Sequence, residues 1–276
     1  MSYEEVLGKQ VIAISISESP DMPALGLSDG HLSDAMAEIA RHLLALGARL
    51  MYGGDLRQHG FSELLFELVS RYQRDSAEND RRTDVLNFLA WPVHILLSAT
   101  SLKSKVADLD GRAELLCLKL DGTRLPLEER LRLTQQLPTE AEWSAGLTAM
   151  RRTMLAKSDA RIVLGGRVNN YKGSMPGIAE EALMSLQGKQ PLYLMGGFGG
   201  CTRDIAETVG LAQPWAKSHV TWQGRTEFDR FSADDLNNGL SIEENQMLAM
   251  TPHVDQAVML ILRGLMRVAR QTDQTD

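Results

Sequence analysis

The sequence predicts an α/β protein with a Rossmann-like fold, in which an open, mostly parallel β-sheet carries helices on both faces. Short, apolar, β-branched segments alternate along the chain with amphipathic helical segments, a pattern typical of such folds. Several of these strand candidates end directly in paired glycines. The length of 276 residues suits one large α/β domain, so we expect residues 1–276 to form a single domain.

The first half of the chain shows this alternation most clearly. Residues 10–17 (QVIAISIS) predict a buried parallel strand, and apolar residues then recur at helical spacing from Leu32 to Leu46. Residues 49–52 predict a second strand, and residues 61–72 predict a second helix. A strand–helix–strand–helix order at this spacing indicates parallel strands joined by right-handed crossovers.

The middle of the chain is less regular. Residues 85–97 contain a third strand candidate, which Pro92 interrupts and therefore places at an edge or a bend of the sheet. Residues 115–120 fit either a strand or a short helix, because their periodicity does not decide between the two. Residues 126–136 predict a helix rich in Glu and Arg.

A longer helix is predicted for residues 140–156, and a capping box formed by Thr139 and Glu142 marks its start. Its apolar face, rich in methionine, fits packing in the core; as an alternative, it supplies a surface for self-association. The C-terminal part, about residues 229–270, predicts further helices that pack on the sheet.

Three strand candidates end in glycine pairs, and we expect these pairs to lie together. In a parallel sheet the C-terminal strand ends meet at one edge, where ligands bind. Glycine lets a phosphate or ribose approach the backbone, and a helix that begins after such a loop offers unpaired N–H groups to an anion. Nearby arginine and lysine side chains add positive charge. The predicted ligand-binding residues are Gly53, Gly54, Asp55, Arg57, Gly165, Gly166, Arg167, Lys172, Gly173, Gly177, Gly196, Gly197, Phe198, Gly199, Gly200, Thr202 and Arg203.

Missing motifs and the composition exclude several classes of protein. No GxGxxG follows the first strand, and neither GxxxxGK[ST] nor GxSxG is present, which argues against a dinucleotide dehydrogenase, a P-loop enzyme and an α/β-hydrolase. Two cysteines without metal-ligand spacing predict no metal site, and we expect no cofactor. A net charge of −7 argues against nucleic acid as a partner, and no apolar run is long enough to span a membrane. We therefore expect a cytoplasmic protein with a small-molecule ligand.

Several motifs resemble those of a known group of proteins. The segment RLMYGGDLRQHGFSE resembles the first glycine loop of LOG-type proteins, and MRRTMLAKSDARIVLGGR followed by PGIAEE is similar to their later glycine signature. These proteins belong to the SLOG superfamily, whose fold is Rossmann-like. The GGR…KGxxPGIxEEA form and the later GGFGG are most similar to the branch with TRP melastatin channel domains and phage-defence sensors such as the Thoeris effector. The resemblance covers about residues 10–210 and implies a pocket for a nucleotide or an ADP-ribose-like ligand.

Two departures from the LOG pattern bear on catalysis. LOG enzymes release the base of a nucleoside 5′-monophosphate with a signature Glu and an upstream Arg. The resemblance places these roles at Glu181, with Glu180 adjacent, and at Arg151. However, roughly ten residues interrupt the glycine signature that is continuous in LOG enzymes, and GGFGG belongs to the sensor-like branch. Both departures favour binding over turnover.

The sequence thus supports two hypotheses with a ligand; a third, an interaction protein whose fold has lost its ligand, is disfavoured by the three intact glycine loops. The first is a sensor for an NAD-derived or ADP-ribose-like ligand, which would signal through a homo-oligomer or an effector protein. The alternative is an N-glycosidase that acts on a nucleotide through Glu181 or Glu180, with Arg151 holding a phosphate or the carboxylate. A purely structural interpretation of the paired glutamates is that they offset the dipole of the helix in whose first turn they lie.

Overall fold

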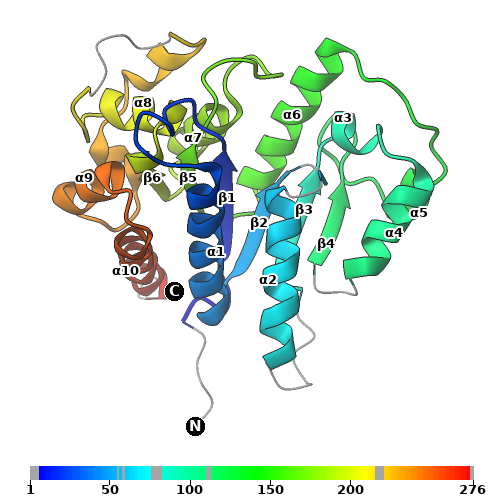
Figure 1. Cartoon of the computed structure of the whole chain (residues 1–276), viewed down its shortest axis with the longest axis horizontal. Helices are drawn as coiled ribbons and strands as arrows, with labels where there is room; N and C mark the ends of the chain where they lie inside the picture. Colours follow the sequence, from blue (N-terminus) through cyan, green and yellow to red (C-terminus); the bar gives the residue numbers. More distant parts are fainter. Residues whose placement is uncertain are drawn as a thin grey trace.

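The computed structural model describes residues 6–54, 56–57, 60–75, 83–109, 113–214 and 221–273. Within these ranges, six parallel strands form one open sheet in the order β4-β3-β2-β1-β5-β6 (Figure 1), which confirms the predicted Rossmann-like α/β fold. The strands are β1 (Val11–Ser17), β2 (Arg49–Gly53), β3 (Val85–Leu89), β4 (Ala113–Cys117), β5 (Ala160–Gly165) and β6 (Leu192–Met195).

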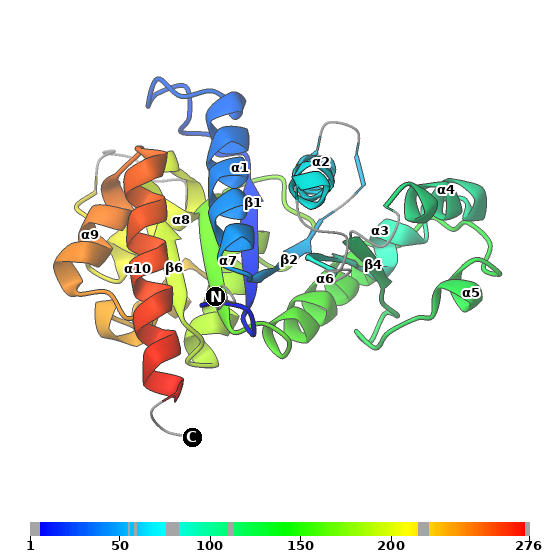
Figure 2. The same cartoon turned by 90° about the horizontal axis from the view of Figure 1, so that it is seen from below.

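Helices cover both faces of this sheet. On one face α1 lies between α2 and α10, as Figures 1 and 2 both show, while α6, α7 and α8 pack along the other face. The α-helices are α1 (Asp29–Ala45), α2 (Phe61–Asp75), α3 (Trp91–His94), α4 (Ala99–Leu109), α5 (Leu127–Arg130), α6 (Glu140–Leu155), α7 (Gly177–Gln187), α8 (Gly200–Thr208), α9 (Ile242–Met250) and α10 (Val254–Asp273). Short 3-10 helices are η1 (Gly196–Phe198), η2 (Arg225–Phe228) and η3 (Ala233–Leu236).

The central strand β1 shows how the side chains divide between the two layers. Ile12, Ile14 and Ile16 belong to the core beneath α1 and α10, whereas Ala13 packs toward α6. Ser15 also points to this second face, where it contacts Arg161. Successive side chains of a strand point to opposite faces, so one register fixes both layers.

The order in which the chain adds strands to the sheet reverses beside β1. From β1 it adds β2, β3 and β4 on one side, and it then returns to place β5 and β6 on the other side. Both neighbours of β1 are parallel to it, with Ile14 paired to Tyr52 on one side and to Ile162 on the other. This is a topological switch point, and ligands of open α/β sheets bind at the C-terminal strand ends beside it.

The middle of the chain differs from the sequence-based prediction in three respects. Pro92 lies in the first turn of α3, so β3 ends before it and runs between β2 and β4 instead of at an edge. Proline is well tolerated there because the first N–H groups of a helix have no intrahelical partner. The helix predicted for residues 126–136 is only the single turn α5, and α4 was not predicted at all.

The long helix α6 begins with the predicted capping box, in which the Thr139 side chain accepts from the backbone N–H of Glu142. Its residues Met150 and Met154 are buried against β2 and β3. These methionines therefore belong to the core, and self-association of the chain stays a prediction. Among the described helices, none is both long and apolar enough to cross a bilayer.

Candidate functional site

Two of the three glycine loops meet at the C-terminal edge of the sheet. The loop after β5 and the loop that leads from η1 into α8 are in backbone contact, because the Cys201 N–H donates to the carbonyl oxygen of Gly166 over 3.2 Å. A Cβ atom added at Gly200 would overlap that same oxygen. Gly166 and Gly200 have φ angles of +106° and +67°, which an L-residue rarely adopts. Glycine is thus required at this junction by the protein's own packing.

The other glycines are also packed against protein atoms. A Cβ at Gly196 or Gly197 would overlap backbone at the end of α9, and one at Gly53 would lie 2.6 Å from the Met154 sulfur. Phe198 and Thr202, also predicted as ligand-binding residues, are buried with 1% and 0% exposure. Asp55, the remaining residue predicted for the first loop besides Arg57, lies outside the described residues. The glycine pairs share one edge of the sheet, as predicted, but in this conformation they are closed off by protein atoms: Gly166 by Cys201, the pair after β6 by the end of α9, and Gly53 by α6.

The predicted cationic side chains have partners within the protein. Arg167 forms an ion pair with Glu18, which follows β1. The Lys172 ammonium lies 3.6 Å from the centre of the Trp143 ring. A ligand phosphate would have to displace one of these partners to use either cation.

Arg203 is the most buried of these cations, with 7% exposure. Its Nε donates to Glu207 over 2.9 Å, and its Nη2 donates to the Gln213 carbonyl oxygen over 2.9 Å. These contacts join α8 to the segment that follows it. Phosphate binding by Arg203 stays a prediction, and in this structure its side chain holds α8 and the following segment together.

The structure brings together the three residues to which the resemblance assigned a catalytic role. Arg151 of α6 pairs with Glu180 of α7 and lies 3.5 Å from a Glu181 oxygen, and all three side chains are buried. The Thr148 hydroxyl donates a 2.5 Å hydrogen bond to Glu180. The first turn of α7 packs directly on Arg151, because a Cβ at Gly177 would lie 2.5 Å from its Nη2 atom. Gly173, from the loop before α7, is also close, because a Cβ there would lie 3.5 Å from Arg151 and 3.9 Å from Glu180.

A second arginine completes this buried cluster. Arg161, the second residue of β5, is 1% exposed, and its Nη1 lies 3.0 Å from Glu181 and donates to the Ser15 hydroxyl over 2.8 Å. Its Nε donates to the Ser185 hydroxyl over 3.2 Å. Burial lowers the pKa of Arg161, and the nearby Glu181 carboxylate opposes that effect. Sequence reasoning missed Arg161, although an arginine inside an apolar strand candidate is itself a sign of a buried acidic partner.

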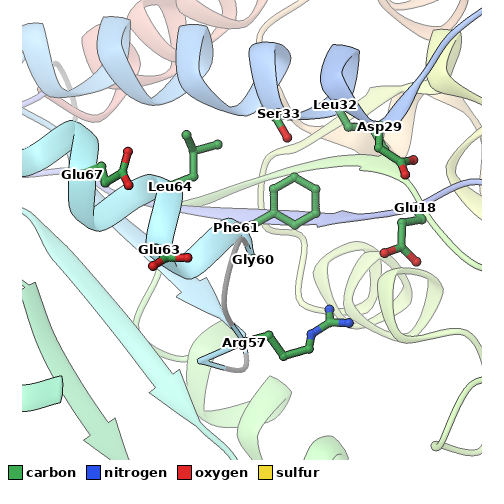
Figure 3. A pocket seen from close by; sticks show the side chains of 10 residues that line it. All are labelled: Glu18, Asp29, Leu32, Ser33, Arg57, Gly60, Phe61, Glu63, Leu64 and Glu67. Atoms are coloured by element: carbon green, nitrogen blue, oxygen red, sulfur yellow. The ribbon is translucent and has the colours of Figure 1, made fainter. Parts of the chain in front are cut away.

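A cavity of about 430 Å³ opens at the same edge of the sheet, between the first turns of α1 and α2. In Figure 3 the Phe61 ring stands between the two helices, and the Arg57 guanidinium points toward the side on which Glu18 lies. Glu18 directly follows β1, and Arg57 and Gly60 lie between β2 and α2, which places the cavity at the C-terminal edge of the sheet. Its lining residues are Glu18, Asp29, Leu32, Ser33, Arg57, Gly60, Phe61, Glu63, Leu64 and Glu67.

The lining of this cavity combines one aromatic ring, one guanidinium and four carboxylates. Glu18 pairs with Arg167, Glu67 pairs with Arg71 at 3.8 Å, and Glu63 also has a partner within the protein. Carboxylates accept hydrogen bonds from hydroxyl and amino groups but repel phosphates, so this lining suits the sugar and base of a nucleotide better than its phosphate. Of the lining residues only Arg57 was predicted, because acidic residues at helix starts also have a purely structural role in offsetting the helix dipole.

Among the described residues, no group of three or more His, Cys, Asp or Glu side chains is arranged to hold a metal ion. Both cysteines are buried and free. Burial raises the pKa of the Cys117 thiol to about 11 and raises that of Cys201 further, so neither favours the nucleophilic thiolate.

Comparisons with known proteins support the resemblance. The family model described as SLOG cluster2 matches residues 6–249. Among solved structures, the chain is similar to the X-ray structure of TM1055, from a structural genomics consortium, with 18% identity and a TM-score of 0.37, over 72% of this chain and 81% of that one. A search of curated proteins found no match. The fold assignment rests on the strand order itself, since the structural likeness is distant.

Proposed function

The chain belongs to the SLOG cluster2 family, and this membership supports a nucleotide-related domain. We propose that the protein is a nucleotide-binding sensor. Its ligand would be NAD-derived or ADP-ribose-like. The observation that carries this proposal is the cavity at the C-terminal edge of β1 and β2, beside the topological switch point. At about 430 Å³ the cavity falls within the size range of small-molecule sites and accommodates a nucleoside.

In this proposal the cavity holds the base and ribose. The Phe61 ring stacks on the base, and the carboxylates of Asp29 and Glu63 accept hydrogen bonds from ribose hydroxyls or an exocyclic amine. The phosphates lie where the lining is cationic, toward Arg57 and Arg167. The negative lining would disfavour a ligand with phosphates at both ends.

The alternative, an N-glycosidase, draws support from the cluster of Arg151, Glu180 and Glu181. Binding without turnover is favoured because both carboxylates are held in buried ion pairs beneath the loop before α7. Moreover, the cluster lies on the α6 and α7 face of the sheet, whereas the cavity lies between α1 and α2 on the other face. A nucleoside in the cavity is therefore separated from these glutamates by β1.

A sensor must also pass on its signal. A ligand shifts an equilibrium only if it binds two states with different affinity, so a conformational or assembly change has to accompany binding. We propose that a homo-oligomer or an effector protein reads this change, and that the protein acts in the cytoplasm.

The central experiment identifies the ligand directly. Protein purified from cells is denatured, and any released nucleotide is identified by mass spectrometry. In parallel, thermal unfolding with AMP, NAD, ADP-ribose and cyclic ADP-ribose ranks candidate ligands, because a ligand of the native state raises stability with its concentration. We expect at least one of the larger nucleotides to raise the melting temperature.

Turnover is tested on the same samples. We expect the wild-type protein to release no free base from AMP, NAD or ADP-ribose over hours, as measured by chromatography. Steady base release that is lost in Glu180→Gln or Glu181→Gln would instead establish the glycosidase. An absence of stabilisation by every nucleotide, with none released on denaturation, would refute the binding proposal.

A further inference from the structure

The loop between β1 and α1 carries two carboxylates into positions that anions would otherwise take. Glu18, its first residue, forms an ion pair with Arg167, the cation beside the glycine loop after β5. Asp21 accepts a 2.7 Å hydrogen bond from the backbone N–H of Gly200, the first residue of α8. Figure 1 shows this loop, in dark blue, above the end of β1 and beside α8.

The contact made by Asp21 is the kind that a phosphate makes. The first N–H groups of a helix lack intrahelical partners and carry partial positive charge, so they bind anions. The close approach depends on Gly199, where an added Cβ would lie 2.6 Å from the Asp21 Cβ atom. The Ser19 hydroxyl accepts from the Asp21 N–H over 3.2 Å and holds the carboxylate in place. The N-terminus of α8 and Arg167 are therefore both occupied by the chain's own anions.

The loop combines internal hydrogen bonds with a side chain that is anchored in the core. It has internal turns, in which the Leu25 N–H donates to the Asp21 carbonyl oxygen over 3.0 Å and the Leu27 N–H donates to that of Met22 over 2.9 Å. Ser19 and Met22 are buried, whereas Pro23, Ala24 and Gly26 at its outer end are exposed. Met22 also belongs to the core beneath α1 and α10 and anchors the loop, so an incoming anion has to displace only the Glu18 and Asp21 side chains.

We propose that two carboxylates in the loop of residues 18–28, Asp21 and Glu18, compete with ligand phosphates at the N-terminus of α8 and at Arg167. This rests on the proposed nucleotide-binding function and adds its regulation. In the structure described here the loop holds the site in a self-occupied state. A ligand with phosphates exchanges for the Glu18 and Asp21 carboxylates. The rearranged side chains, of which Glu18 also borders the cavity, distinguish the bound state.

The test removes the competing charges and measures anion binding by calorimetry. The probes are inorganic pyrophosphate, ADP-ribose and adenosine. Asp21→Asn keeps an oxygen that accepts from Gly200 but loses the negative charge, and we expect it to bind pyrophosphate and ADP-ribose about tenfold more tightly than wild type. Glu18→Gln breaks only an exposed ion pair, and we expect a gain of about threefold. Adenosine affinity should stay unchanged in both variants.

The matched control is Asp34→Asn, which removes the same charge from an exposed position on α1. We expect it to bind pyrophosphate as wild type does. Melting temperatures of all variants show whether the fold is kept, and Glu18→Gln provides the test if Asp21→Asn proves unstable.

The outcomes separate this proposal from the proposed function. If wild type binds ADP-ribose but neither Asp21→Asn nor Glu18→Gln binds pyrophosphate more tightly than Asp34→Asn does, the competing loop is refuted and nucleotide binding stands. If the two variants gain pyrophosphate affinity but no nucleotide binds to any protein, the competing loop stands and the nucleotide proposal fails. A similar gain in all three variants would mean that only overall charge matters, which also refutes the competing loop.

Discussion

The two sides of the sheet, on either flank of β1, bury charge in different ways. On the β5–β6 side, the fully buried Arg161 is paired with a carboxylate of another element, Glu181 of α7. On the β3–β4 side, Arg130 is also fully buried, but its partners are neutral: its Nη2 donates to the carbonyl oxygens of His94 and Leu97, and its Nε donates to the His94 ring over 2.8 Å. Among the described residues, no carboxylate pairs with Arg130.

The same contrast holds for the C-terminal strand ends. On the β5–β6 side the glycine loops close on each other, whereas the ends of β1 and β2 leave a cavity. The comparison shows that neither a buried arginine nor a glycine pair is by itself a sign of a ligand site. The β5–β6 side is held shut by contacts between elements, so the base and ribose are expected where β1 and β2 end.

The largest effect should come from removing Glu181, because Arg161 would then keep a buried charge without its carboxylate partner. We expect Glu181→Ala to lower the free energy of unfolding by roughly 3–5 kcal/mol, measured by urea denaturation. Glu140→Ala is the matched control, since Glu140 is an exposed acidic residue in the first turn of α6 and should contribute less than about 1 kcal/mol. Equal losses in the two variants would mean that Glu181 stabilises the protein only through the dipole of α7.

Because the partners of Arg130 on the β3–β4 side are uncharged, the stability of the protein should depend on pH. The His94 Nε2 donates to the Leu118 carbonyl oxygen over 2.8 Å while its Nδ1 accepts from Arg130, so both ring nitrogens are used by the neutral form. Burial lowers the pKa of His94 to about 4. The unfolded chain takes up this proton near the ordinary pKa of about 6.5, so stability is full above that value and falls as the pH drops toward 4.

We expect this histidine to account for a loss of about 2 kcal/mol in the free energy of unfolding between pH 7 and pH 5. His94→Gln cannot take up the proton, so urea denaturation of this variant should show a shallower slope over the same range. His253→Gln serves as control and should keep the wild-type slope. An unchanged slope in His94→Gln would mean that other groups dominate the acid response.

The closed glycine junction can be tested against a glycine that meets no neighbour. Gly200 and Gly210 have similar φ angles, +67° and +83°, but a Cβ at Gly210 has no atom within 4 Å, whereas one at Gly200 would overlap the Gly166 oxygen. We expect Gly210→Ala to cost about 1 kcal/mol for the left-handed backbone alone and Gly200→Ala to cost roughly 2 kcal/mol more. Equal costs in thermal or urea unfolding would show that the loops are not in close contact in solution.

The smallest expected effect concerns the cavity. Phe61→Leu keeps an apolar side chain but removes the ring, so we expect nucleotide affinity to fall about fivefold, since an aromatic contact is worth about 1 kcal/mol. Phe66→Leu on the same helix is the control, because Phe66 does not line this cavity. A second cavity lies between α2 and α4 and is lined by Phe66, so a larger loss in Phe66→Leu would place the base there.

Much of the fold was predictable, because each strand and helix has to cover a buried face. Parallel strands such as β1 are rich in apolar, β-branched residues, and the 3.6-residue period of α1 is intact. The helix α4 escaped prediction because it lies at one end of the sheet and buries only Leu102 and Leu109, too few to give a periodic pattern.

The site was predictable in place but not in detail. Glycine allows a close approach of backbone by a ligand and by another loop equally well, so the sequence does not reveal that Gly200 meets Gly166. The meeting of Arg151 with Glu180 was implied by family resemblance, whereas the carboxylates of the cavity depend on how α1 and α2 are placed relative to each other. Such relations between distant segments leave no local pattern.

The last helix, α10, bears on how this protein can be produced and dissected. The family match ends at residue 249, but α10 covers α1 with buried Val258, Ile261 and Leu265. A chain shortened to the matched range would leave this apolar stripe of α1 open to water, and exposed patches of that kind cause aggregation. The limit of sequence similarity is therefore not a limit of folding, and recombinant versions should retain the chain through residue 273.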